Sequence, residues 1–321
     1  MDINTARAAI DAYRPLLADD DMARLEFFLG LWEFQQGIKT RALEAGGEPV
    51  PEGAPLAEWY WGEKPLLAMA PLELDTALFA DALKGCTAQL VEGAGLDAEL
   101  ANALTGFDWA GLAAEANGNA QTPSEALTTG QSPAKAGSDP GAFIEALYTR
   151  LGEEGHSEPF RESVALIVTL ALRPLLEPAA DVLGTAMVAD EQNATRLKPL
   201  LCPVCGSHAA TSRVGDVPSG AKNGRLLSCS LCGMQWEFER IRCSRCGTQN
   251  QGKLHYFHAE GDDAHRLYLC DECGGYTRTT FAQNLRVSFS FEVEDVVMAR
   301  LDHIAQDPRF WDSKNRSQPR A

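Results

Sequence analysis

The C-terminal part of this chain is specified by two cysteine segments, Cys202-Pro203-Val204-Cys205-Gly206 and Cys229-Ser230-Leu231-Cys232-Gly233. The pattern recurs 41 residues later as Cys243-Ser244-Arg245-Cys246-Gly247 and Cys270-Asp271-Glu272-Cys273-Gly274. Within each repeat 23 residues separate the two CxxC pairs, and 10 residues separate the repeats. Four cysteines in this pattern are the usual ligands of one tetrahedral metal centre. Each repeat therefore contains a complete ligand set.

A glycine follows every CxxC pair, which is typical of a knuckle turn, where one residue adopts a left-handed conformation. Because a duplicated unit is expected to close on itself, we predict two metal sites, one in each repeat. Site 1 consists of Cys202, Cys205, Cys229 and Cys232, and site 2 of Cys243, Cys246, Cys270 and Cys273. A cross-braced arrangement, in which the first pair joins the third and the second joins the fourth, is the alternative.

Four thiolates suit either Zn²⁺ or a single iron ion, and the ligands alone do not distinguish them. Two roles follow. The metal stabilises a small domain that could not fold without it, or an iron centre exchanges electrons and senses or donates redox equivalents. We favour the first role.

The charge of the chain is unevenly distributed. The 321 residues carry a net charge of −17, but residues 200–290 contain 10 Lys and Arg against 8 Asp and Glu, about +2. This difference suggests two separately built parts. An acidic surface repels phosphate, so nucleic acid is disfavoured as a partner despite Arg240, Arg242 and Arg245, which we expect to neutralise the metal-thiolate centres.

Hydrophobic stretches give no indication of export or membrane insertion. Charged residues interrupt Met1 to Gly30, and the longest apolar run, Val164 to Leu172, is too short to span a bilayer. Paired metal-binding thiols also fit a reducing compartment. We therefore expect a soluble, cytoplasmic protein.

Periodicity predicts a mainly α N-terminal domain. Helices are expected at 3–45, 72–92, 97–116, 141–153 and 158–190, with Pro174 and Pro178 kinking or dividing the last. Between them, 48–71 is predicted to be an extended loop carrying Trp59, Tyr60 and Trp61, whose aromatic rings we expect to pack in the core. Residues 117–140 are predicted to be a flexible insertion or loop outside the core.

Short β-like segments occupy the cysteine region, at 225–228, 235–241, 254–257 and 266–269, and one amphipathic helix, Glu292 to Gln306, is expected to pack back on a neighbouring domain. The predicted domains are 1–198 (acidic and helical), 199–285 (tandem four-cysteine modules, 199–240 and 241–285) and 286–321 (helix and tail).

Other candidate functional residues favour structural roles. Cys86 has no CxxC partner and is expected in the core. Because eight cysteines already complete two sites, His208, His255, His258 and His265 are not predicted as ligands. We find no nucleophile with a neighbouring base and no phosphate-binding loop, so we predict no enzymatic activity and no catalytic residues.

The segments Cys202 to Gly206, Gly224 to Trp236, Arg242 to Gly247 and Cys270 to Tyr276 together resemble the formate dehydrogenase accessory protein family, FdhE. The likeness covers residues 199–281. It implies an α-helical domain followed by two rubredoxin-like or zinc-ribbon-like modules, with iron in the cell and zinc possible in a purified sample. Arg278 stands where the family often has Lys, and the 117–140 insertion is longer than expected.

The resemblance also implies a function. Family members bind the catalytic subunit of formate dehydrogenase during its maturation and are needed for its activity. The alternatives are a rubredoxin-like electron-transfer or redox-sensing protein and a nucleic-acid-binding ribbon protein.

Overall fold

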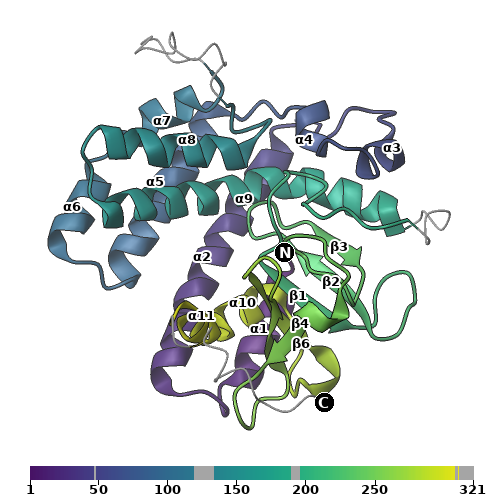
Figure 1. The fold of residues 1–321 in the computed structure, drawn as a ribbon. Helices are drawn as coiled ribbons and strands as arrows, with labels where there is room; N and C mark the ends of the chain where they lie inside the picture. The colour runs from purple at the N-terminus through teal and green to yellow at the C-terminus, as the bar shows by residue number, and fades with distance from the viewer. Residues whose placement is uncertain (47, 119–133, 189–195, 308–309, 311–321) are drawn as a thin grey trace.

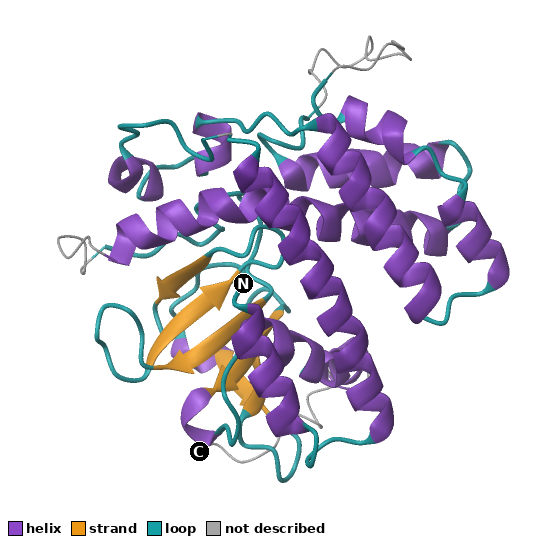
Figure 2. Cartoon of the chain, turned by 180° about the vertical axis from the view of Figure 1, so that it is seen from behind, coloured by secondary structure: helices purple, strands orange, loops and turns teal. Residues whose placement is uncertain are grey.

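The computed structural model describes residues 1–46, 48–118, 134–188, 196–307 and 310. A helical N-terminal part is followed by one six-stranded sheet and two short helices (Figures 1 and 2). The strands carry two groups of four cysteines. The predicted fold class, a mainly α N-terminal part with a small β-rich part containing two four-cysteine modules, is confirmed.

Nine helices are described before the cysteine region. They are α1 (Ile3–Tyr13), α2 (Asp19–Glu44), α3 (Leu56–Tyr60), α4 (Leu66–Met69), α5 (Thr76–Gly93), α6 (Ala98–Thr105), α7 (Trp109–Glu115), α8 (Pro140–Glu153) and α9 (Glu158–Val188). The single helix predicted over 3–45 is wrong: α1 ends at Tyr13 and α2 begins at Asp19, because Pro15 has no backbone N–H to continue the helical hydrogen bonds. The loop predicted over 48–71 contains α3 and α4.

Helix α9 lies between helices α5 and α8 on one side and the sheet on the other (Figure 1). The sequence predicted a kink or a division at the prolines, and the division does not occur, since α9 continues through Pro174 and Pro178. A proline within a helix costs about 3 kcal/mol. Of six apolar side chains that are at most 8% exposed, the five of Val, Ile and Leu each contribute about 1.5–3 kcal/mol, which outweighs that cost. The six are Val164, Ile167, Val168, Ala171, Leu175 and Leu176.

By length and hydropathy, residues Glu158–Met187 of α9 resemble a membrane span, which is longer than the apolar run read from the sequence. Two thirds of its most hydrophobic window, 67%, is buried inside the protein. This burial is what the core helix of a soluble protein shows, so the helix is weak evidence for a membrane.

The insertion predicted over 117–140 is described only at its ends, and residues 119–133 lie outside the described residues. At one end, the Asn117 side chain donates to the Leu74 carbonyl at 2.6 Å. At the other, Ala136 is 0% exposed within the main hydrophobic core. The expectation that this segment stays outside the core is therefore wrong for Ala136.

The six strands are β1 (Thr211–Gly215), β2 (Gly224–Ser228), β3 (Gln235–Phe238), β4 (Leu254–Phe257), β5 (His265–Cys270) and β6 (Tyr276–Phe281), with the one-turn helices η2 (Gln251–Lys253) and η3 (Ala282–Asn284). Their order is β3-β2-β1-β6-β5-β4. Each repeat thus forms an antiparallel three-stranded unit, and the units join through the parallel pair β1–β6. Both strands of that seam were missing from the prediction.

The C-terminal segment forms two helices, α10 (Phe291–Val297) and α11 (Ala299–Gln306), where one was predicted. They divide at the buried Met298, because α10 packs on α1 and α2 while α11 packs on β5. The prediction that this segment packs back on a neighbouring domain is confirmed.

Candidate metal centres

The four CxxC segments form four knuckles with the same backbone hydrogen bonds. In each, the glycine N–H donates to the carbonyl of the first cysteine, at 2.9–3.0 Å. The four glycines have φ between 68° and 79°, the left-handed region in which side chains are strained, as the sequence predicted. The first cysteine of each pair donates its own N–H across the turn, at 2.8–3.0 Å, which fixes the direction of both sulfurs.

The structure gathers the sulfurs within each repeat, as the in-unit arrangement requires, and the cross-braced arrangement is not observed. In site 1, Sγ of Cys202 lies 3.4 Å from that of Cys232, and Sγ of Cys205 lies 3.5 Å from that of Cys229. The four atoms lie within 4.8 Å of one another. All four cysteines are free thiols and buried.

Site 1 is buried because helices cover both of its knuckles. The backbone N–H groups of Leu66 and Leu67, in α4, donate to the carbonyls of Pro203 and Val204 at 2.8 and 3.0 Å. On the second knuckle, a Cβ at Gly233 would lie 3.3 Å from the Glu177 side chain of α9. The helical part therefore closes the first centre from solvent.

Site 2 has the same arrangement of sulfurs, but only two of its four cysteines are buried. The Cys243–Cys273 and Cys246–Cys270 sulfur pairs are both 3.8 Å apart. Cys243 and Cys270 are buried, whereas Cys246 and Cys273 are exposed. A Cβ at Gly274 would have no neighbour within 4 Å among the described residues. The second centre is therefore open to solvent on one side.

Both groups fit a four-thiolate metal ion. Tetrahedral sulfurs at about 2.3 Å from an ion are about 3.8 Å apart, as in site 2 and slightly longer than in site 1. A disulfide needs only about 2.05 Å. Each group could hold one ion, and the thiolate donors suit zinc and iron equally.

Arg225 connects the two repeats and was not predicted as a functional residue. It is 1% exposed, and it donates to the Ser212 hydroxyl at 3.2 Å and to the Arg242 carbonyl at 3.0 Å. Its guanidinium carbon lies 4.5 Å from the centre of the Tyr268 ring. Burial lowers the pKa of Arg225. An arginine from repeat 1 thus supports the first knuckle of repeat 2.

The arginines expected to neutralise the thiolates have mixed roles. Arg242 pairs with Glu239 at 3.0 Å and donates to the Lys198 carbonyl at 2.8 Å. It therefore holds the backbone that leads into the cysteine region. Arg245 is closer to the cysteines, since its backbone N–H donates to Sγ of Cys243 at 3.3 Å. Arg240 donates to the Asn223 carbonyl at 3.5 Å.

The histidines lie outside both cysteine groups in the described part of the chain. His255 pairs with Asp271 at 2.9 Å, and burial together with the charge of Arg245 lowers the pKa of His208.

His265 belongs to a buried polar cluster that sequence analysis missed. Its Nδ1 lies 2.9 Å from Asp262, its Nε2 lies 2.7 Å from Glu294, and the Tyr13 hydroxyl donates to Glu294 at 2.9 Å. Burial lowers the pKa of His265, but its two carboxylate partners outweigh that effect and raise it to about 9. The cluster connects β5 to α1 and α10. These residues lie up to 281 positions apart, and no local pattern indicates such a contact.

Two further predictions are confirmed. Cys86 is 0% exposed in the main core, and burial raises the pKa of its thiol to about 12. In the aromatic segment, Tyr60 is 5% exposed, and Trp59 and Trp61 pack against the core half-buried.

The fold and the two thiol clusters define a class of protein: a helical protein carrying a tandem pair of four-cysteine knuckle modules, each of which could hold a metal ion. The family model of the FdhE central domain matches residues 201–240. A "Protein FdhE homolog" of Shewanella oneidensis is 39% identical over 83 residues, and "Protein FdhE" of Escherichia coli O1:K1 / APEC is 37% identical over 84 residues. Each match covers 26% of this chain and 26% of the relative, so the similarity spans about a quarter of those proteins.

The fold of the whole chain is similar to that in the crystal structure of the FdhE protein from Pseudomonas aeruginosa. The TM-score is 0.51 at 18% sequence identity, over 94% of this chain and 90% of that one. This likeness shows the fold, and the matches above supply the sequence evidence. The cysteine region is thus similar in sequence to FdhE proteins, and the whole chain is similar in fold to one of them.

Proposed function

We propose that this protein is a formate dehydrogenase accessory protein: a chaperone-like maturation factor that binds the catalytic subunit of formate dehydrogenase and is needed for its activity. The observation that carries the proposal is the match of the first cysteine module, residues 201–240, to the FdhE central domain. The two thiol clusters, which fit one metal ion each, support it.

In this proposal the eight cysteines of sites 1 and 2 are metal ligands, with iron in the cell and zinc possible after purification. The ions stabilise the sheet on which the partner-binding surface depends. The domains are 1–198, 199–285 and 286–321, although the hydrophobic core continues from the helices into the first module. We place the protein in the cytoplasm, where thiols stay reduced.

The proposed role is not enzymatic. Four protein thiolates fill a tetrahedral coordination sphere and leave no position for a substrate or an activated water. The chain would then act through binding, and catalysis belongs to its partner.

Co-purification with the catalytic subunit of formate dehydrogenase tests the proposal. We expect the wild-type chain to retain that subunit, and Cys229→Ser and Cys270→Ser to retain less and to support less formate dehydrogenase activity in cells. Cys86→Ala is the matched control, because it removes a buried thiol outside both clusters. Unchanged binding and activity in both serine variants would contradict the proposal.

A rubredoxin-like electron carrier is the second candidate, because Cys246 and Cys273 are exposed, as electron transfer at site 2 would require. Reversible bleaching of thiolate-to-iron absorption, with turnover in a reconstituted electron-transfer chain, would favour this role. The maturation role would be favoured if zinc-loaded protein retained the catalytic subunit and supported formate dehydrogenase activity as well as iron-loaded protein does.

A further inference from the structure

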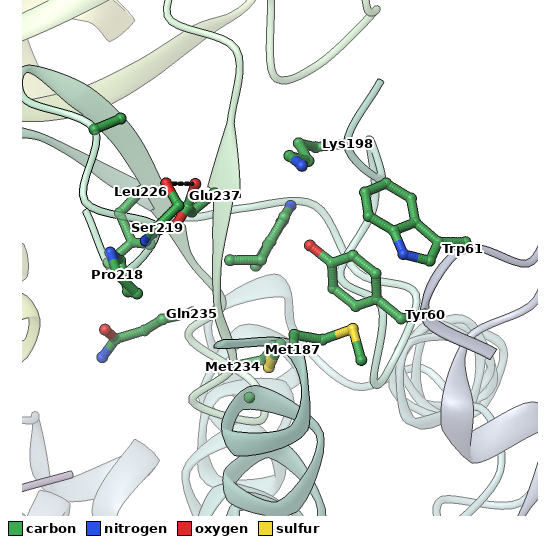
Figure 3. A pocket seen from close by; sticks show the side chains of 13 residues that line it. Tyr60, Trp61, Met187, Lys198, Pro218, Ser219, Leu226, Met234, Gln235 and Glu237 are labelled. Carbon is green, nitrogen blue, oxygen red and sulfur yellow. Dashed lines mark hydrogen bonds between the residues drawn. The ribbon is translucent and has the colours of Figure 1, made fainter. Parts of the chain in front are cut away.

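A cavity of about 510 Å³ lies beside β3, the end strand of the sheet (Figure 3). Tyr60 and Trp61 form one wall, and Met187 of α9 comes from below. Gln235 to Glu237 of β3 form part of the opposite side. None of the eight clustered cysteines lines the cavity, so it is separate from both candidate metal centres.

The cavity reaches the outer edge of β3. The N–H of Cys229 donates to the Met234 carbonyl, toward β3, whereas the carbonyl of the preceding Ser228 accepts from Ala210, toward β1. The backbone groups of successive residues along this hairpin therefore point alternately to one side and to the other. The backbone groups of Gln235 and Glu237 therefore point away from β2. Among the described residues, no backbone hydrogen bond from outside the sheet reaches these two positions. Such an edge is a template for an added strand.

The floor of the cavity is apolar and deformable. Met187 and Met234 both line it, and Trp236 is held in place by donating its indole N–H to the Pro199 carbonyl at 3.0 Å. Thioether side chains adapt their shape to a bound group more readily than branched ones. This floor suits one unbranched or leucine-sized apolar side chain.

The polar groups at the cavity favour a ligand that carries a hydrogen-bond acceptor. Tyr60 gives the clearest evidence. Tyr60 is 5% exposed, yet its hydroxyl makes no hydrogen bond within the described part of the chain and faces the cavity. Lys198 also lines the cavity, with Nζ 4.8 Å from the centre of the Trp61 ring. The carboxylate of Glu237, in contrast, already accepts from the Ser219 N–H and hydroxyl at 2.7 and 2.8 Å.

We propose that this cavity binds an extended segment of another polypeptide as an added strand beside β3. One apolar side chain of that segment lies over Met187 and Met234, and a carboxylate accepts from Tyr60 next to Lys198. The inference rests on the proposed function in one respect, that the protein acts by binding another polypeptide. The feature that is bound is an extended segment with an apolar side chain and a carboxylate.

Fluorescence anisotropy with defined peptides tests this site in the full-length, metal-loaded protein. The probe is a labelled nonapeptide of alternating threonine and valine that carries one leucine and one aspartate. Tyr60→Phe should bind it about tenfold more weakly, because a hydrogen bond to a carboxylate is lost. Tyr148→Phe in α8 is the matched control and should bind as wild type does, because Tyr148 lies outside the cavity.

Modified peptides separate the contributions. N-methylation of alternate backbone amides should abolish binding by an added strand. An amidated peptide with aspartate, compared with a free-acid peptide without it, shows whether the carboxylate comes from a side chain or from a chain terminus. Serine in place of the leucine should weaken binding about tenfold or more, since the apolar contact is lost.

The inference is overturned if no peptide of the panel binds, if Tyr60→Phe binds as tightly as wild type, or if N-methylation has no effect. It is also overturned if the occupant is a second copy of this chain, seen as a dimer that Tyr60→Phe dissociates. None of these results excludes co-purification with the catalytic subunit of formate dehydrogenase, so the proposed function could still hold. Peptide binding without that co-purification would instead contradict the proposed function.

Discussion

The two cysteine modules share a ligand pattern and a strand order but are packed differently. Module 1 (residues 199–240) extends the apolar core of the helices, with all four thiols buried. Module 2 (residues 241–285) has two exposed thiols and is held to the helices largely by the polar cluster of Tyr13, His265 and Glu294 and by the contact of α11 with β5. The same metal-binding unit can therefore be a structural core in one copy and a surface element in the other.

The largest difference between the two modules is expected when one cysteine ligand is removed from each site. Cys229→Ser should release the site 1 ion, with a loss on the order of 10 kcal/mol, and should disrupt the core that the module shares with α4 and α9. Cys246→Ser should release the site 2 ion but leave the melting of the helices nearly unchanged. Metal content and thermal melting followed by far-UV circular dichroism check both.

Cys205→Ser serves as a second buried variant and should behave like Cys229→Ser. If Cys229→Ser and Cys246→Ser lower the melting temperature of the helices equally, the contrast between core and surface modules is wrong.

Arg225 and Arg266 test whether equivalent positions of the repeat have different roles. Arg225→Lys keeps the charge but loses the planar donors that reach Ser212 and the Arg242 carbonyl, so we expect a loss of roughly 3–4 kcal/mol. Arg266→Lys, 41 residues later, should cost under about 1 kcal/mol, because that side chain is only half-buried. Equilibrium urea unfolding measures both, and equal losses would contradict the asymmetry.

The attachment of module 2 should depend on pH through His265. Its folded-state pKa of about 9 lies above the ordinary value of about 6.5. The protonated form thus contributes stability of roughly 3 kcal/mol, fully present below about pH 6.5 and lost as the pH rises through about 9. Unfolding free energies measured across this range should fall in wild type.

His265→Gln should be less stable at low pH and should show a flatter profile over the same range. His258→Gln is the matched control, because its partly exposed ring lies outside the cluster, and it should keep the wild-type slope. A wild-type slope in His265→Gln would show that another group controls this pH dependence.

Local sequence patterns were sufficient for the cysteine groups and for most helices. Four CxxC-Gly segments specify four knuckles, because glycine relieves the left-handed strain at each turn. The strands β1 and β6 were missed because their residues, such as Ser212 and Thr279, are polar. They are nonetheless buried at the seam, where their hydroxyls lie 2.8 Å apart. A periodicity of hydrophobic residues does not detect a buried strand with polar side chains.

The different burial of the two sites could not be predicted from the repeat, because it depends on contacts between distant segments. Leu66 and Leu67 cover site 1 from more than 130 positions away in the sequence, and nothing in the cysteine pattern indicates that contact. The same holds for Tyr60, whose place in the cavity depends on how α3 packs against α9.

The smallest expected effect is kinetic. Solvent and a chelator can reach Cys246 and Cys273 directly, whereas site 1 must first separate from α4 and α9. A chromogenic chelator should therefore remove the two ions in two phases of one equivalent each, with site 2 at least tenfold faster, about 1.4 kcal/mol in activation free energy. Cys246→Ser should lose only the fast phase. A single phase of two equivalents would mean that both centres open together, in which case the exposure of two thiols has no effect on how firmly the second ion is held.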